Sequence, residues 1–270
     1  MIRLLSTDFD GTLVSHEKNP GVVPELFTAL RELRDAGVKW AVNTGRTLWH
    51  AEEGLRNEFR FPIEPDYLLV EERDIYRRTR SGGWEPVGEW NRRAARDTEE
   101  LFALAAPLLA EVLRFQERFD GVQAIYDRGH FIGSVTKTTA DMDELCRFLG
   151  EIRERLPMFN FQRNTIYVRF CHHAYSKGTA LSELARHLDL SPDAIFATGD
   201  HFNDLPMLDG IHARHVACPG NSCDEVKQLV RVAGGYIAKG TASAGVVESL
   251  RHFGAWPVKN TRNQSAGGGA

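Results

Sequence analysis

The chain has 270 residues, a formal net charge of −4 and 42% hydrophobic residues. This length fits one large domain or two smaller ones, and the mild negative charge argues against sequence-independent nucleic-acid binding, which requires a basic face. No apolar run approaches the roughly 18 residues of a membrane span, so we expect no membrane partner, no export and a cytoplasmic location.

The first apolar segment, residues 2–7, ends in two aspartates, Asp8 and Asp10. We predict a buried strand that is interrupted at Gly11. If the extended geometry continues past the strand, Asp8 and Asp10 lie on the same side of it. Two carboxylates so close together repel each other unless a cation, a shared proton or hydrogen-bond donors offset their charge.

The next segments alternate between strand and helix patterns. In order, we expect a helix carrying Leu26, Leu30 and Leu33, a strand from Val38 that ends in Thr44-Gly45-Arg46, a helix over 48–59, and a strand over 66–71. This alternation predicts a parallel sheet with crossover helices.

The middle of the chain has a different pattern, beginning with a hairpin over 75–87. We then expect a helix over 98–119, strands over 122–126 and 131–136, a helix over 141–156, and strands over 158–162 and 165–171. Such an order is typical of a small antiparallel sheet with helices on one side. We therefore predict a separate α+β unit here, of a plausible domain size.

The first pattern resumes after Tyr175. We expect a helix led by Ser176-Lys177-Gly178, a strand over 194–198 that ends in Gly199-Asp200, short strands near 216–218 and 236–238, and helices near 224–232 and 245–253. The last residues, 260–270, are polar and glycine-rich, and we expect them to be disordered.

Three of these strands end in polar, chemically competent groups: after residue 7, at Thr44 to Arg46, and at Asp200. A single aspartate at a strand end is usually a helix cap or a turn former, but carboxyl ends of parallel strands share one crevice. The carboxylates of Asp8 and Asp200 would hold Mg²⁺ there, and Lys177 would add positive charge. This arrangement suggests phosphoryl transfer with Asp8 as nucleophile and Asp10 as acid and base.

Four motifs resemble the haloacid dehalogenase-like (HAD) phosphatases, in particular subclass IIB, the Cof-like group. They are Asp8-Phe-Asp10-Gly-Thr12, Thr44-Gly-Arg46, Lys177-Gly-Thr-Ala-Leu and Gly199-Asp200-His-Phe-Asn203-Asp204. The resemblance implies an α/β fold: a Rossmann-like parallel-sheet core with an inserted α+β cap of the αββαββ type, subclass C2B. The core would comprise 1–88 and 172–259, and the cap 89–171.

The resemblance also implies a role for each motif residue. Asp8 would be the nucleophile and Asp10 the general acid and base. The phosphate would be bound by Thr44, Gly45, Arg46, Lys177 and Asn203. The metal, Mg²⁺, would be bound by Asp8, Asp10 (through its main-chain carbonyl), Asp200 and Asp204. Two stretches, Glu71-Glu72-Arg73-Asp74 and Cys218-Pro219-Gly220-Asn221, depart from the family pattern.

We therefore expect a Mg²⁺-dependent phosphatase that acts on a small phosphorylated metabolite, such as a sugar phosphate, through an aspartyl-phosphate intermediate. The alternatives are a phosphomutase of the phosphomannomutase type and a non-catalytic phosphate-binding protein. Specificity would lie in the cap, where the polar candidates are Tyr126, Asp127, Lys137, Arg163 and Asn164, although hairpin tips favour such residues in any case. Neither the substrate nor the oligomeric state follows from the sequence.

Overall fold

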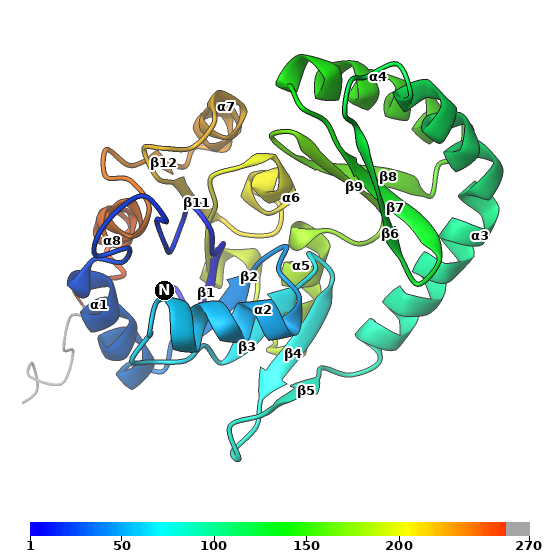
Figure 1. The fold of residues 1–270 in the computed structure, drawn as a ribbon. Helices are drawn as coiled ribbons and strands as arrows, with labels where there is room; N and C mark the ends of the chain where they lie inside the picture. Colours follow the sequence, from blue (N-terminus) through cyan, green and yellow to red (C-terminus); the bar gives the residue numbers. More distant parts are fainter. Residues whose placement is uncertain (258–270) are drawn as a thin grey trace, which may run out of the picture.

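The computed structural model describes residues 1–257, so the tail expected at 260–270 lies outside the described residues. This part of the chain folds around two β-sheets, one of eight strands and one of four (Figure 1). None of the helices in this range has both the length and the apolar character that a membrane crossing requires.

The eight-stranded sheet has the strand order β12-β11-β10-β1-β2-β3-β4-β5. Its strands are β1 Leu4–Thr7, β2 Lys39–Asn43, β3 Tyr67–Val70, β4 Asp74–Arg78, β5 Trp84–Pro86, β10 Ile195–Thr198, β11 His215–Cys218 and β12 Tyr236–Ile237. The six strands from β12 to β3 are parallel, whereas β4 and β5 are antiparallel additions at one edge. The central strand β1 lies between β10 and β2, so three polar strand ends are neighbours.

Helices cover both faces of this sheet, because successive strand residues alternate between two apolar cores. Leu5 packs into the first core and Leu4 into the second. The helices of the first core are α1 Pro24–Asp35, α2 Leu48–Glu53 and α8 Ser243–His252, and those of the second are α5 Lys177–His187, α6 Leu205–Leu208 and α7 Asp224–Val232. The sheet is therefore buried on both faces, as parallel sheets require.

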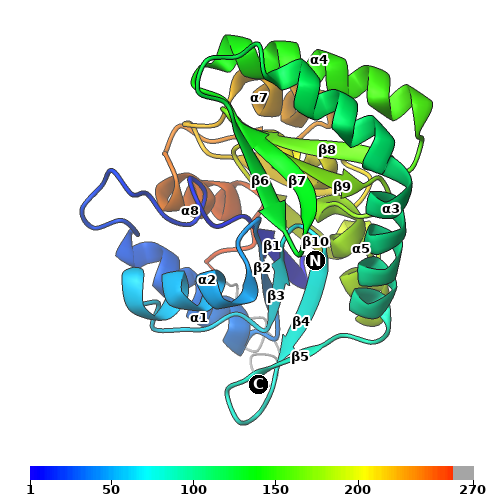
Figure 2. The ribbon, with the colours of Figure 1, turned by 45° about the vertical axis from the view of Figure 1, so that its right-hand side comes forward.

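The four-stranded sheet is antiparallel and has its own apolar core. Its elements are α3 Trp90–Gln116, β6 Gln123–Asp127, β7 His130–Val135, α4 Thr139–Arg155, β8 Phe159–Asn164 and β9 Tyr167–His172, with the strand order β6-β7-β9-β8. Helices α3 and α4 lie on one face of the sheet, and the other face turns toward the large sheet (Figures 1 and 2).

The α/β class predicted from the sequence, with a mainly parallel sheet and a second α+β unit, is confirmed, but two helices differ from their predicted extent. Helix α3 begins at Trp90 rather than at 98, because its first turns pack Trp90 and Ala94 against the core of the large sheet. The helix predicted over 48–59 is regular only to Glu53 and continues as one π-helical turn, Gly54–Glu58.

Candidate active site

One cleft, with a volume of about 730 Å³, lies between the carboxyl ends of the central strands and the small sheet. The large sheet contributes Asp8, Asp10, Gly11, His16, Glu17, Thr44, Gly45, Arg46, Glu72, Asp200, His201 and Asn203 to its walls, and the small sheet contributes Gln162, Arg163, Asn164, Thr165, Tyr167 and Arg169. The sequence motifs after β1, β2 and β10 thus meet in a single cleft, as the parallel-sheet prediction requires.

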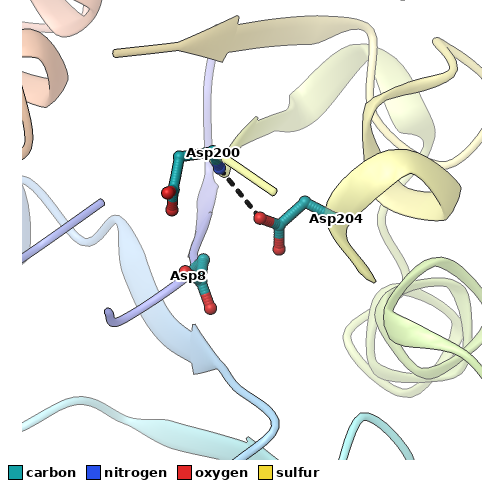
Figure 3. A group of neighbouring side chains, drawn as sticks. All are labelled: Asp8, Asp200 and Asp204. Atoms are coloured by element: carbon teal, nitrogen blue, oxygen red, sulfur yellow. Dashed lines mark hydrogen bonds between the residues drawn. The ribbon is translucent and has the colours of Figure 1, made fainter. Parts of the chain in front are cut away.

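The acidic residues after β1 and β10 converge at this cleft, which Asp8 and Asp200 line and Asp204 does not. Asp8, Asp200 and Asp204 each offer a carboxylate oxygen, and these oxygens all lie within 4.8 Å of one another (Figure 3). The Lys177 ammonium donates to Asp8 Oδ1 and to Asp204 Oδ1, each at 2.6 Å. Thr12 Oγ1 donates to Asp200 Oδ1 at 2.7 Å. One ammonium group therefore faces three carboxylates.

Main-chain donors orient the carboxylate of Asp204, which lies at the end of the 3₁₀ turn Phe202–Asp204. Its Oδ2 accepts hydrogen bonds from the Asp200 N–H at 2.8 Å and from the His201 N–H at 2.9 Å. These two bonds leave Oδ1 for Lys177. Asp204 is fully buried, so this geometry is fixed by the turn itself rather than by solvent.

The electrostatics of the cluster show an excess of negative charge. Burial and the neighbouring Asp204 raise the pKa of Asp8 well above its ordinary value, although Lys177 acts in the opposite direction. Burial and Asp204 likewise raise the pKa of Asp200 to about 7. Burial alone would lower the pKa of Lys177, but Asp204 and Asp8 outweigh it and raise that pKa. Lys177 is therefore charged, and the cluster favours additional positive charge.

Two glycines allow the acids to approach one another. Gly11 has a φ of +76°, and a Cβ atom on it would lie 2.3 Å from Asp200 Oδ2. A Cβ atom on Gly199 would lie 2.3 Å from the carboxyl carbon of Asp204. Both distances are below any real contact, so a side chain at either position would displace a carboxylate of the cluster.

We expect Gly199→Ala to lower the free energy of unfolding by about 1–3 kcal/mol, because the added methyl group overpacks the buried turn. Gly150 in α4 is the matched control, since a Cβ atom there meets nothing within 4 Å. Gly150→Ala should raise the stability by roughly 0.5–1 kcal/mol through helix propensity. Urea denaturation of both variants measures the difference, and equal stabilities would contradict the proposed packing.

Asp10 lies apart from the acidic cluster and is bound by two basic side chains. Arg46 donates to its two carboxylate oxygens at 2.6 and 2.8 Å, and His16 Nε2 lies 2.8 Å from Oδ1. Burial alone would raise the pKa of Asp10, but the bonds from Arg46 and His16 outweigh it and lower that pKa. The pKa of Asp8 is thus raised and that of Asp10 is lowered. An ionised nucleophilic Asp8 and a proton-carrying Asp10 would require the opposite.

Of the predicted phosphate-binding residues, Thr44, Gly45, Arg46 and Asn203 line the cleft, whereas Lys177 is fully buried and does not line it. Thr44 is buried, and its Oγ1 accepts from the Arg46 N–H at 3.2 Å. The Arg46 guanidinium binds Asp10 and stands 4.6 Å from the centre of the Phe9 ring. Asn203 Nδ2 donates to Glu72 Oε1 at 2.7 Å. Arg46 and Asn203 therefore contact acidic side chains in this structure.

The small sheet brings only some of its predicted polar residues to the cleft. Arg163 and Asn164 line it, whereas Asp127 lines a separate cavity between α3 and β9. Tyr126 is exposed and is absent from both linings, and Lys137 is paired with Asp120 at 2.6 Å. Most of the polar candidates predicted from the sequence lie at hairpin tips, whereas the small sheet's side of the cleft is formed mostly by one face of β8 and β9.

Residues that the sequence analysis did not single out also line the cleft. From the small sheet these are Gln162, Tyr167 and Arg169, and from the large sheet His16, Glu17, Glu72 and His201. Period-2 alternation along 159–172 could have separated Gln162, Tyr167 and Arg169 from the apolar face of the sheet. For Glu72, the signal was its departure from the family pattern.

The acidic cluster fits a hard divalent cation. Its donors are carboxylate oxygens alone, which Mg²⁺ prefers, and the three negative charges exceed the single charge of Lys177. Burial and the neighbouring Asp204 raise the pKa values of Asp8 and Asp200, although Lys177 acts in the opposite direction. A bound cation would favour their ionised forms.

The fold is that of a haloacid dehalogenase-like hydrolase. A family model with that description matches residues 115–250, and the chain belongs to this family. The family predicted from the four sequence motifs is thus confirmed, and the protein is a hydrolase.

Among curated relatives, a phosphoglycolate phosphatase of Methanoculleus marisnigri is 28% identical over 77% of this chain and 81% of its own length. A mannosylfructose-phosphate phosphatase of Agrobacterium fabrum is 26% identical over 95% of this chain and 98% of its own length. Among solved structures, the sucrose-phosphatase of Synechocystis sp. PCC6803, in complex with sucrose and phosphate, aligns with a TM-score of 0.68. That alignment covers 94% of this chain and 99% of the other at 20% identity, and it shows a shared fold.

Proposed function

We propose that the protein is a Mg²⁺-dependent phosphatase that hydrolyses a small phosphorylated metabolite, with a sugar phosphate as the substrate. The observation that carries the proposal is the cluster of Asp8, Asp200 and Asp204 around Lys177, at the carboxyl ends of adjacent parallel strands. The relatives named for phosphoglycolate, mannosylfructose phosphate and sucrose phosphate support the reaction class. Two of those three names are of sugar phosphatases.

The residues that would hold Mg²⁺ are Asp8, Asp200 and Asp204, together with the main-chain carbonyl of Asp10. When bound, the ion supplies positive charge that offsets the carboxylates and the phosphoryl group that approaches them. Lys177 supplies the second positive charge from its place between Asp8 and Asp204. The nucleophilic attack and the proton transfers would be carried out by side chains of this protein.

Asp8 is the proposed nucleophile, because its carboxylate is held against Lys177 at the floor of the cleft. It would attack phosphorus in line and form an aspartyl phosphate as the alcohol departs. Thr44 would donate to a phosphoryl oxygen, and the main-chain N–H of Gly45 and the amide of Asn203, which line the same cleft, would contribute further donors. Lys177 would stabilise the charge that develops on the equatorial oxygens.

Asp10 is the proposed acid and base: it would protonate the departing oxygen and later take a proton from water. Its lowered pKa in this structure arises from Arg46 and His16, so both contacts must loosen for Asp10 to carry a proton. A phosphate in the cleft would give the Arg46 guanidinium another anionic partner. Arg46 would then move between Asp10 and substrate, which links phosphate binding to protonation of Asp10.

The unit from residue 89 to 171 is the proposed cap over the core of 1–88 and 172–259. Arg163, Tyr167 and Arg169 of this unit form a wall of the cleft opposite the acids. Closing this wall on a substrate would exclude water from the reacting groups. Specificity for the alcohol part of the substrate is expected to depend on this wall.

Phosphate release from a panel of sugar phosphates, nucleotides and p-nitrophenyl phosphate tests the proposed function. We expect steady turnover with Mg²⁺ at neutral pH and a loss of at least about 100-fold when the ion is chelated, since the acids then repel the anionic substrate. Release without a bisphosphate activator would exclude a phosphomutase. Bound phosphate with no turnover across the panel would instead favour a non-catalytic phosphate-binding protein.

A further inference from the structure

Glu72 enters the cleft from the turn between β3 and β4. It follows Glu71. The φ values are +51° for Glu71 and +60° for Glu72, in the left-handed region that favours glycine and asparagine. The turn is fixed by main-chain bonds from the Glu71 N–H to the Arg46 carbonyl at 2.9 Å and from the Glu72 N–H to the Thr44 carbonyl at 3.1 Å. The phosphate-binding loop therefore holds Glu72 in place.

The Glu72 carboxylate is buried, with 8% of the residue exposed, and only one of its oxygens has a partner. Oε1 accepts the hydrogen bond from Asn203, and it lies 3.1 Å from the position that a Cβ on Gly45 would occupy. Oε2 has no hydrogen-bond partner within residues 1–257. A buried carboxylate oxygen without a donor is costly, so a group that supplies the donor would be bound favourably once a movement of the side chain opens Oε2 to the cleft.

The position of Glu72 defines which part of a substrate it can reach. On one side it adjoins the proposed phosphate-binding residues Gly45 and Asn203. It lines the same cleft as Tyr167 and Arg169 of the small sheet, and the charges of Glu72 and Arg169 act on each other. Glu72 thus lies between the residues proposed to bind the phosphate and the wall of the small sheet that is expected to contact the alcohol part of the substrate.

The basic residues of the opposite wall are already paired. Arg169 donates to Glu71 Oε2 at 3.2 Å, and Arg163 is bound to Asp143. Each guanidinium therefore already has an acidic partner within the protein, which lowers the gain from binding a carboxylate next to the phosphoester. Burial raises the pKa of Glu72, whereas Lys177 and the bond from Asn203 act in the opposite direction. In its ionised form Glu72 would repel an anionic group placed there, because like charges in a partly dry cleft are strongly unfavourable.

We propose that Glu72 is a specificity-determining residue that accepts a hydrogen bond from a hydroxyl group beside the phosphoester and rejects substrates with a second acidic group there. This inference rests on the proposed phosphatase function and refines it. The substrate class is then a phosphorylated neutral polyol, such as a hexose phosphate, rather than a phosphorylated hydroxy acid such as phosphoglycolate.

The test compares Glu72→Gln with the unaltered protein. Glutamine keeps the size of the side chain and an oxygen that can accept from Asn203, but it removes the charge and introduces a donor. Glucose 6-phosphate and phosphoglycolate are each measured as competitive inhibitors of p-nitrophenyl phosphate hydrolysis, which reports binding whether or not they turn over. We expect the unaltered protein to prefer glucose 6-phosphate and Glu72→Gln to reduce that preference about tenfold, mainly through tighter binding of phosphoglycolate.

Two further variants separate this role from a general effect of charge or structure. Glu17→Gln removes the same charge from an exposed residue of the same cleft, and we expect the preference to change by less than about twofold because solvent screens that charge. Glu72→Ala removes the acceptor, and we expect glucose 6-phosphate to bind about 10- to 100-fold more weakly.

The preference ratio decides the outcome. A ratio that stays within twofold in Glu72→Gln, or an unaltered protein that binds phosphoglycolate as well as glucose 6-phosphate, overturns the role of Glu72 while leaving the phosphatase function in place. An unaltered protein that hydrolyses no phosphomonoester overturns both proposals. Circular dichroism of each variant confirms that a changed ratio reflects the folded protein.

Discussion

Asp8→Asn is expected to reduce phosphate release by about 10⁴-fold or more while leaving the protein folded. Asparagine has nearly the shape of aspartate, but its amide is not a nucleophile, so the proposed aspartyl phosphate cannot form. Asp8 is buried, and its carboxylate accepts a hydrogen bond from Lys177 at 2.6 Å. The loss should therefore appear in kcat, because the residues that bind the phosphate stay in place.

The measurement is steady-state phosphate release at saturating substrate, with circular dichroism as the check on folding. Asp189→Asn is the matched control: Asp189 is exposed and has a φ of +54°, a conformation that asparagine accepts. That control should retain activity within about twofold. An Asp8→Asn protein that keeps more than a tenth of the activity would rule out the covalent route, since hydrolysis would then proceed without a nucleophilic carboxylate.

The fold was largely predictable from the sequence because the strands are short apolar runs that end in glycine or acid. Buried parallel strands have such runs, and the order of strand and helix then limits the topology. Helix α3 was predicted too short because its first two turns bury only Trp90 and Ala94. These turns are stabilised by a contact with the core of the large sheet, a tertiary contact that has no periodic signature in the sequence.

The candidate site was predictable to the level of which residues share the cleft. Motif spacing placed Asp8, Asp200 and Lys177 at strand ends and at a helix start, and parallel pairing brings those ends together. The contacts of Asp10 were not predictable in this way. Strand β1 ends at Thr7, so the extended geometry that would put Asp8 and Asp10 on one side does not continue, and Asp10 binds Arg46 instead.

Glu72 shows a different limit of sequence-based reasoning. The four residues 71–74 were identified as a departure, but propensity alone predicts that two consecutive glutamates lie in solvent. Their left-handed backbone, which the bonds to Thr44 and Arg46 hold in place, turns Glu72 inward instead. Positive φ values at residues other than glycine cannot be inferred from a single sequence, and here they decide which side chain enters the cleft.

Lys177→Met is expected to destabilise the protein by about 3–5 kcal/mol and to abolish phosphate release. Lys177 is fully buried, and each of its two ion pairs is 2.6 Å long. Methionine fills a similar volume but leaves the carboxylates of Asp8 and Asp204 without their cation, and an uncompensated buried charge is far more costly than a lost surface pair. The expected fall in the midpoint of thermal unfolding is roughly 6–20 °C for a chain of this size.

The pH dependence of the loss separates this electrostatic cause from a packing defect. Burial and Asp204 already raise the pKa of Asp8, and removing Lys177 would raise it further, so the folded state would bind protons that the unfolded state releases. The destabilisation should therefore grow as the pH rises from about 5 to 8, whereas a packing defect would be independent of pH. Lys39→Met is the matched control, because Lys39 pairs with Asp66 at 2.9 Å on the surface. That pair should contribute about 1 kcal/mol or less. If both variants lost the same stability at every pH, Lys177 would not be the cation that holds the acidic cluster together.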